Sequence, residues 1–207
     1  MAKRIDTRTL TGLAILTAVV VILQLLGSFI RFGVFSISLV LIPIVVGAAM
    51  YGALAGAWLG FVFSVVVLIM DSAAFMVINP FGTVVTVILK GTLAGLAAGL
   101  IYRPLRKTGV FLTIEAREKE VWRTDLGVAV SAIVCPVVNT GLFLLGCLCF
   151  FMPTIREWAA TAGFENAGTY MIVGFVGGNF LFEVLFNILL SPLIVRLVEM
   201  GKKGGAK

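Results

Sequence analysis

The chain has 207 residues, of which 60% are hydrophobic and only 13% are charged, and its mean hydropathy is +1.14. No soluble domain needs this much apolar surface, so the composition indicates a polytopic membrane protein with one domain over residues 1–207. The absence of histidine excludes His-ligated metal sites, haem ligation and Ser–His or Cys–His hydrolases. We therefore expect no enzyme, no metal and no cofactor.

Six apolar stretches predict an all-α fold, a bundle of six transmembrane helices. The predicted spans cover about residues 9–26, 39–50, 53–70, 83–102, 126–150 and 170–198. The first run is too long for the apolar region of a signal peptide. No charge interrupts residues 32–70, so we expect a tight turn near Tyr51 and Gly52 between the second and third spans.

The basic residues predict the topology of these spans. Six spans place both termini on one side of the membrane, and outside the spans only Arg31 and Arg156 among the basic residues fall on the other side. By the positive-inside rule, we expect both termini in the cytoplasm of a multi-pass protein of the cell membrane. The segments at about 27–38, 71–82 and 151–169 are then outer loops. The net charge of +6 follows from this topology and indicates no nucleic-acid partner.

Two further features of the sequence give predictions. The polar segment 103–125 is expected to be cytoplasmic and partly helical around Ile114–Trp122. The cysteines lie within one apolar span without a CxxC pair, and we interpret them as small packing residues; they are Cys135, Cys147 and Cys149.

Lys90 lies inside the stretch Thr83–Tyr102, roughly 10 Å from its outer end. A lysine at such a depth costs about 2.5–3.5 kcal/mol unless it finds a partner or water. A glycine ladder follows it on one helix face, and a second ladder occupies the third span, at Gly91, Gly95, Gly99 and at Gly52, Gly56, Gly60. These ladders predict two antiparallel helices that pack closely through their glycines.

Polar residues within the spans predict a ligand pocket that opens to the outside, because buried polar groups in lipid need partners and often mark substrate paths. The predicted substrate-binding residues are Arg31, Lys90, Asn139, Asn179, Glu183 and Asn187. Arg31 and Lys90 lie in the outer half, which favours an anionic group on the ligand. Two alternatives remain open: Lys90 pairs with Glu183 while the asparagines join helices, and Arg31 is an ordinary interfacial arginine.

The first span carries an AxxxA pair, Ala14 and Ala18, which by itself equally serves simple helix packing. Together with six spans, cytoplasmic termini and the spacing of Pro43, Gly47, Gly52 and Gly56, the pair resembles the S component of energy-coupling factor (ECF) transporters over about residues 9–198. In that family the S component binds one vitamin or trace nutrient from outside. Its AxxxA face docks on a transmembrane coupling subunit that two cytoplasmic ATPases drive, so the resemblance implies this docking role for Ala14 and Ala18. It implies no substrate residues.

The leading hypothesis is therefore a high-affinity substrate-capture subunit for a vitamin-like small molecule. The sequence has no GxxxxGK[ST] motif, so ATP-driven transport would need separate ATPase subunits. Pantothenate and folate are examples of an anionic substrate, and riboflavin stacked on loop phenylalanines is the alternative. Two other functions are a stand-alone proton-coupled secondary transporter that uses Glu183 or Asp71, and an intramembrane enzyme with a Glu183–Lys90 acid/base pair but no nucleophile.

Overall fold

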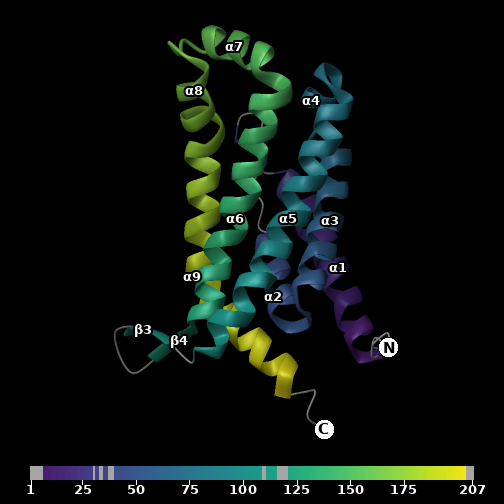
Figure 1. The fold of residues 1–207 in the computed structure, drawn as a ribbon, viewed down its shortest axis with the longest axis vertical. Helices are drawn as coiled ribbons and strands as arrows, with labels where there is room; N and C mark the ends of the chain where they lie inside the picture. Colours follow the sequence, from purple (N-terminus) through teal and green to yellow (C-terminus); the bar gives the residue numbers. More distant parts are fainter. Residues whose placement is uncertain are drawn as a thin grey trace.

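The computed structural model describes residues 7–29, 31–32, 35–36, 40–108, 111–115 and 121–203. Its body is a bundle of helices (Figure 1): α1 Thr7–Ser28, α2 Leu41–Tyr51, α3 Ala53–Met70, α4 Ala73–Ile78, α5 Pro80–Lys107, α6 Leu126–Gly146, α7 Met152–Thr161, α8 Ala167–Tyr170 and α9 Gly178–Lys203. Two short antiparallel hairpins connect helices: β1 Arg31–Phe32 with β2 Phe35–Ser36, and β3 Phe111–Glu115 with β4 Val121–Asp125. Helix α1 begins and α9 ends at the same end of the bundle, opposite α4 and α7. Following the predicted topology, we call the end with α4 and α7 the outer end.

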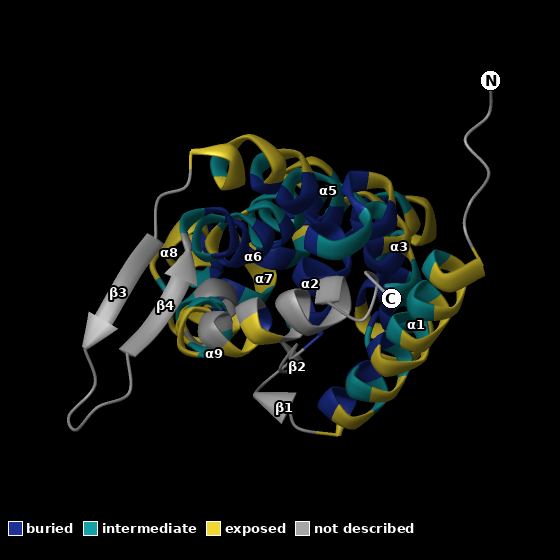
Figure 2. Cartoon of the chain, turned by 90° about the horizontal axis from the view of Figure 1, so that it is seen from below, coloured by how far each residue is buried: buried dark blue, intermediate teal, exposed yellow. Residues whose placement is uncertain are grey.

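Among the described residues, four helical stretches are long and apolar enough to cross a membrane: Thr7–Ser28, Ala53–Met70, Pro80–Lys107 and Leu126–Thr161. Helix α2 is apolar but only 11 residues long, and its residues are mostly buried at the centre of the bundle (Figure 2). The chain is thus a multi-pass, largely helical membrane protein, while six crossing helices stay a prediction.

The turn predicted near Tyr51 and Gly52 is confirmed. Gly52 separates α2 from α3 and has a backbone φ of 103°, a conformation that costs little only for glycine. A Cβ at this position would also meet the guanidinium of Arg103. The backbone conformation therefore favours glycine here, whereas the flexible end of the Arg103 side chain can move aside.

Helices α3 and α5 pack through their glycines, as the two ladders predict. A Cβ on Gly60 would meet the backbone of Gly91, and a Cβ on Gly56 would meet the backbone of Gly95. From one contact pair to the next the residue number rises along α3 and falls along α5, so the two helices are antiparallel. This close backbone contact places Lys90 on a rigid frame, because it directly precedes Gly91.

The polar segment after α5 differs from the prediction. The expected helical part around Ile114–Trp122 is wrong, because residues 111–115 and 121–125 pair as an antiparallel hairpin. The β-branched and aromatic residues of the two strands, which include Ile114, Val121 and Trp122, favour strands over helices. Helix α5 also extends beyond the predicted range, from Pro80 to Lys107.

The outer segments contain more helix than expected. The segment at 71–82 holds α4 and the first turn of α5, where Oδ1 of Asn79 accepts a 2.9 Å hydrogen bond from the backbone N–H of Gly82. This bond caps the helix, and Pro80 is well suited to its first position. The segment at 151–169 holds α7. Two π-helical segments, Cys147–Phe151 and Met171–Gly177, lead into α7 and α9.

Candidate functional site

Lys90 projects toward two aromatic rings on neighbouring helices. Its Nζ lies 5.3 Å from the ring centroid of Phe143 on α6 and 5.9 Å from that of Phe63 on α3. Both distances are within cation–π range. Lys90 is ten residues into α5, which corresponds to about 15 Å from the outer end of the helix. The charge therefore lies between α3, α5 and α6 at depth within the bundle.

Three helices converge on this position. Glu183 on α9 is buried, with only 2% of its surface exposed, and it lies within electrostatic range of Lys90 and near Cys135. Cys135, Asn139 and Phe143 follow one another at intervals of four on α6, so they share a face of that helix. Asn139 therefore occupies the face of α6 that Lys90 and Glu183 approach from α5 and α9.

Several buried oxygens near this convergence accept no hydrogen bond from the described part of the chain. They include Oδ1 of Asn139, Oδ1 of Asn187 and Oγ1 of Thr86. The amide of Asn187 is held locally, because its Nδ2 donates a 2.7 Å hydrogen bond to the backbone oxygen of Glu183. Leaving such an acceptor unsatisfied costs about 1–3 kcal/mol, so these atoms are suited to bind donors of a ligand or water.

Thr86 is a candidate that the sequence reasoning missed. It lies one turn before Lys90 on the same helix and packs against Gly146 of α6, one turn outward from the Lys90–Phe143 contact. The spacing of four residues from Lys90 is the sequence signal that could have found it.

The structure does not place all of the predicted residues. It brings Lys90, Asn139, Glu183 and Asn187 to one region, as described above. Arg31 and Asn179 are placed only by their backbones, in β1 and in the first turn of α9, because their side chains lie outside the described features. The role of all six residues in substrate binding stays a prediction.

An aromatic cluster covers Lys90 on the outer side. Phe75 of α4 is at its centre, and its ring makes edge-to-face contacts with Phe143 at 5.8 Å, Phe151 at 5.1 Å and Trp158 at 5.7 Å between centroids. Phe143 therefore contacts both this cluster and the ammonium of Lys90. The cluster lies on the outer side of the half-buried lysine and connects it to α4 and α7.

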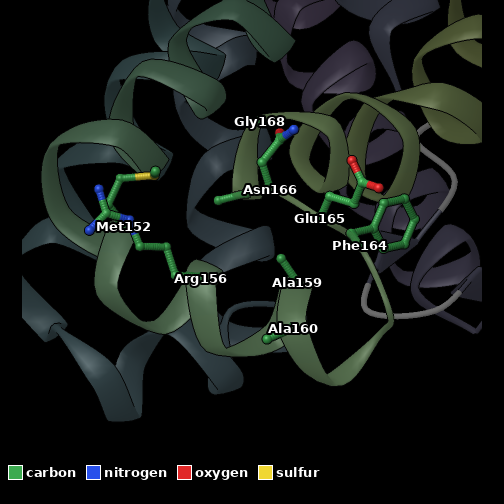
Figure 3. A pocket seen from close by; sticks show the side chains of 9 residues that line it. Met152, Arg156, Ala159, Ala160, Phe164, Glu165, Asn166 and Gly168 are labelled. Carbon is green, nitrogen blue, oxygen red and sulfur yellow. The ribbon is translucent and has the colours of Figure 1, made fainter.

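A hollow of about 430 Å³ lies at the outer end beside α7 and α8 (Figure 3). Its lining is Met152, Arg156, Ala159, Ala160, Phe164, Glu165, Asn166, Ala167 and Gly168. The side chain of Asn166 also caps α8, because its Oδ1 accepts a 2.7 Å hydrogen bond from the backbone N–H of Thr169. The lining contains one positive and one negative side chain, Arg156 and Glu165. The sequence reasoning placed Arg156 outside but did not foresee the hollow.

A family model described as ECF transporter, substrate-specific component, matches residues 8–195. The chain belongs to this family. The resemblance stated from the sequence is thereby confirmed, and the protein is a substrate-specific transport subunit of the membrane. A search of curated proteins found no match.

The N-terminal helix of this S component is the least covered of the candidate spans. In α1, 17% of the membrane-length window is buried, against 33% to 44% in the other three. Ala14 and Ala18 lie on its exposed side, which faces away from the bundle (Figure 2). The bundle described here therefore does not use the AxxxA pair for its own packing.

The opposite side of α1 is attached to α3 by polar contacts at the outer end. Asp71 follows the last residue of α3, and its Oδ2 accepts hydrogen bonds from Nε2 of Gln24 at 2.9 Å and from Oγ of Ser28 at 2.7 Å. Gln24 is fully buried. The sequence shows Gln24 as the one strongly polar residue in its span, but only the structure identifies Asp71 as its partner.

Proposed function

We propose that this S component captures an anionic, vitamin-like nutrient from outside at a site centred on Lys90. The observation that carries the proposal is the convergence of Lys90, Asn139 and Glu183 from three helices below the outer aromatic cluster. Arg31, Asn179 and Asn187 complete the proposed binding residues, and Thr86 is added to them from the structure.

The balance of energies favours an anion. A lysine within the membrane costs about 2.5–3.5 kcal/mol, whereas a cation–π contact contributes about 0.5–2 kcal/mol. The two rings alone therefore offset the cost of Lys90 only in part, and the electrostatic interaction with Glu183 adds to them. A carboxylate or phosphate on the ligand would form a charge-assisted hydrogen bond with the half-buried lysine, where such bonds are stronger than in bulk water.

The buried acceptor oxygens further restrict which ligands would suit the site. The Oδ1 atoms of Asn139 and Asn187 need donors, so a suitable ligand carries N–H or O–H groups in addition to its anionic group. Pantothenate and folate both have this combination. A flavin stacked on the aromatic side chains is the alternative, because its ring system would use the phenylalanines more than the lysine.

For delivery, we propose that the exposed side of α1 docks on the transmembrane coupling subunit, which two cytoplasmic ATPases drive. Ala14 and Ala18 support this role because small residues on an exposed helix face let a partner helix approach closely. The proposed orientation places both termini in the cytoplasm and the Lys90 site toward the outside.

A proton-coupled secondary transporter would need a carboxylate that is available for titration, with Glu183 or Asp71 as candidates. Asp71 accepts two hydrogen bonds from α1, which favours a structural role for it. Family membership favours the subunit function over independent transport.

Mass spectrometry of the purified S component, released from detergent in the gas phase, identifies the compound that is bound to it. This measurement tests the proposed class of substrate. We expect an anionic compound with additional N–H or O–H groups to co-purify. A tightly bound cation would contradict the proposal. Uptake of the same compound by cells should require the coupling and ATPase subunits, and uptake with the S component alone would favour the secondary transporter.

A further inference from the structure

Two buried amide oxygens, one on α6 and one on α9, accept no hydrogen bond from the described part of the chain. They are Oδ1 of Asn139, a residue that is 5% exposed, and Oδ1 of Asn187, a residue that is 2% exposed. The amide of Asn187 is held in one orientation, because its Nδ2 donates a 2.7 Å hydrogen bond to the backbone oxygen of Glu183. Its nitrogen is thus occupied as a donor, and its oxygen is left to bind another group.

The carboxylate of Glu183 lies in the same region. Helices α6 and α9 are in contact and lie side by side (Figure 1). Glu183 is one turn before Asn187 on α9, and it lies near Cys135, which is one turn before Asn139 on α6. It is also the only acidic residue within the six predicted spans. The two helices therefore bring one carboxylate and two amide oxygens together at depth in the bundle.

This set of oxygens has the chemistry of a site for a hard cation. Carboxylate and amide oxygens suit alkali and alkaline-earth ions, whereas zinc and its neighbours prefer histidine and thiolate ligands. The described residues include no group of three His, Cys, Asp or Glu that could hold a metal ion. One carboxylate with two neutral oxygens suits a single positive charge, and Lys90, within electrostatic range of Glu183, disfavours a divalent ion. The expectation of no metal rested on the absence of histidine, which does not bear on oxygen ligands.

We propose that Asn139, Glu183 and Asn187 bind an alkali-metal cation through their side-chain oxygens. Asn139 lies one turn inward of Phe143, whose ring contacts the ammonium of Lys90, so the cation site is deeper in the bundle than the lysine. An amide oxygen has two acceptor lone pairs. A cation on either asparagine therefore still allows a hydrogen bond from a substrate or water.

The cation would also balance the charge of an anionic substrate, a consequence that rests on the proposed function. Lys90 and Glu183 together carry no net charge, so a substrate anion alone would add one uncompensated negative charge at depth, and burial of such a charge is costly. With the anion at Lys90 and the cation at Glu183, each charge has an opposite partner. The ion accompanies the nutrient and does not replace it, which distinguishes it from a cationic nutrient.

Thermal unfolding of the purified, ligand-free S component in detergent tests the cation site without any substrate. The full chain is compared in sodium, potassium and choline chloride at equal chloride concentration and pH. We expect a saturable rise in Tm with Na⁺ or K⁺ over choline, about 3–6 °C at a tenfold excess over the dissociation constant. Equilibrium dialysis with radiolabelled Na⁺ and Rb⁺, the latter in place of K⁺, should give saturable binding of a single ion. Absence of saturable binding of either ion overturns the proposal.

Variants of Asn139 assign the ion to this site. Asn139→Leu keeps the size of the side chain and removes its oxygen, and it should weaken cation binding at least about tenfold, since even groups that only orient metal ligands are worth that much. Asn139→Asp keeps an oxygen and adds a negative charge, so it should retain or tighten binding. Asn166→Ser is the control, because it removes an exposed amide at the outer end and keeps an oxygen that can cap α8. Unchanged cation binding in Asn139→Leu would overturn the site.

The cation site and the proposed substrate fail in different ways. If the ligand-free protein binds neither Na⁺ nor Rb⁺, the cation site is wrong and the anionic substrate is unaffected. If the protein binds the cation as described but co-purifies with no anionic compound, the proposed substrate is wrong and the cation site stands. The dialysis needs no variant, so its result holds even where an Asn139 variant fails to fold.

Discussion

Nε2 of Gln24 donates a 2.9 Å hydrogen bond to Oδ2 of Asp71 and joins the outer end of α1 to the end of α3. The same carboxylate oxygen accepts a 2.7 Å bond from Oγ of Ser28. Asp71 directly precedes the short connection to α4, which carries Phe75 at the centre of the aromatic cluster. The helix proposed to dock on the partner is thus attached, through one carboxylate, to the segment that covers Lys90.

We expect Gln24→Leu and Asp71→Ala each to destabilise the S component by about 1–3 kcal/mol, because each removes a hydrogen bond between a buried amide and a carboxylate. The double variant should lose less than the sum of the two, with a coupling of about 0.5–3 kcal/mol. Thermal unfolding in detergent measures all three. Thr161→Ala is the control, because it removes an exposed hydroxyl–carbonyl bond on α7 and should change stability by no more than about 0.5 kcal/mol. Strictly additive effects would mean that Gln24 and Asp71 act independently.

Lys90→Met keeps the length of the side chain and removes its charge. If Lys90 binds the anionic group of the substrate, the variant should weaken binding by roughly 2–5 kcal/mol, as truncation of one member of a buried charge pair does. Titration calorimetry with the co-purifying compound gives this value. Lys107→Met, at the exposed end of the same helix, is the control and should bind normally.

The alternative pairing of Lys90 with Glu183 gives a different pattern. Lys90→Met alone should then express poorly, because it leaves the Glu183 carboxylate buried without its partner. Lys90→Met/Glu183→Gln should restore the yield. Normal expression together with unchanged binding in the single variant would exclude both roles.

Gly60→Ala should destabilise the bundle by about 1–3 kcal/mol, because its new methyl group would overlap the backbone of Gly91. Gly141→Ala is the matched control, since nothing lies within 4 Å of a Cβ at that helical position. The control should be neutral or stabilising by up to about 1 kcal/mol through helix propensity. Thermal unfolding in detergent compares the two, and equal effects would show that α3 and α5 do not depend on this contact.

Ala14→Trp or Ala18→Trp should abolish transport by the complete transporter and leave substrate binding by the isolated S component intact. The bulky ring would keep a partner helix away from the exposed face of α1. Co-purification with the coupling subunit and radiolabelled uptake measure the loss. Leu100→Trp, at another exposed apolar position, should retain both activities. Loss of binding in the alanine variants would instead assign these residues to the bundle.

Thiol labelling of intact cells tests the orientation. In a Cys149→Ser background, Thr161→Cys on α7 should react with an impermeant reagent from outside, because α7 lies at the predicted outer end. Thr108→Cys, after the last turn of α5, should react only after the membrane is opened. Both threonines are exposed, so accessibility within the protein is matched. If position 108 were labelled from outside, either the predicted orientation or the predicted set of spans would be wrong.

The sequence by itself determined that this protein lies in a lipid bilayer, that its body is helical and which family it belongs to. Apolar runs of about 20 residues are helical in a bilayer because every backbone group must be bonded within its own segment. The contact between α3 and α5 could also be predicted, since glycines four residues apart form a continuous face with no side chains to separate two helices. Lys90 could be recognised as a candidate site residue from the sequence. A charge inside a membrane span is costly, and this is known before its partners are known.

Only the tertiary structure decided which polar residues meet. Asn139 and Glu183 are distant in the chain, and their approach to Lys90 depends on how α6 and α9 pack against α5. The hydrogen bonds to Asp71 come from Gln24 and Ser28 on α1, and neither segment of sequence predicts how α1 is aligned against α3. The hairpin β3–β4 was equally hidden, because strand pairing depends on a partner strand whereas helical bonds lie within one segment. Apart from the glycine contact of α3 with α5, the contacts between elements are fixed only when the whole bundle packs, because periodicity reports on one helix at a time.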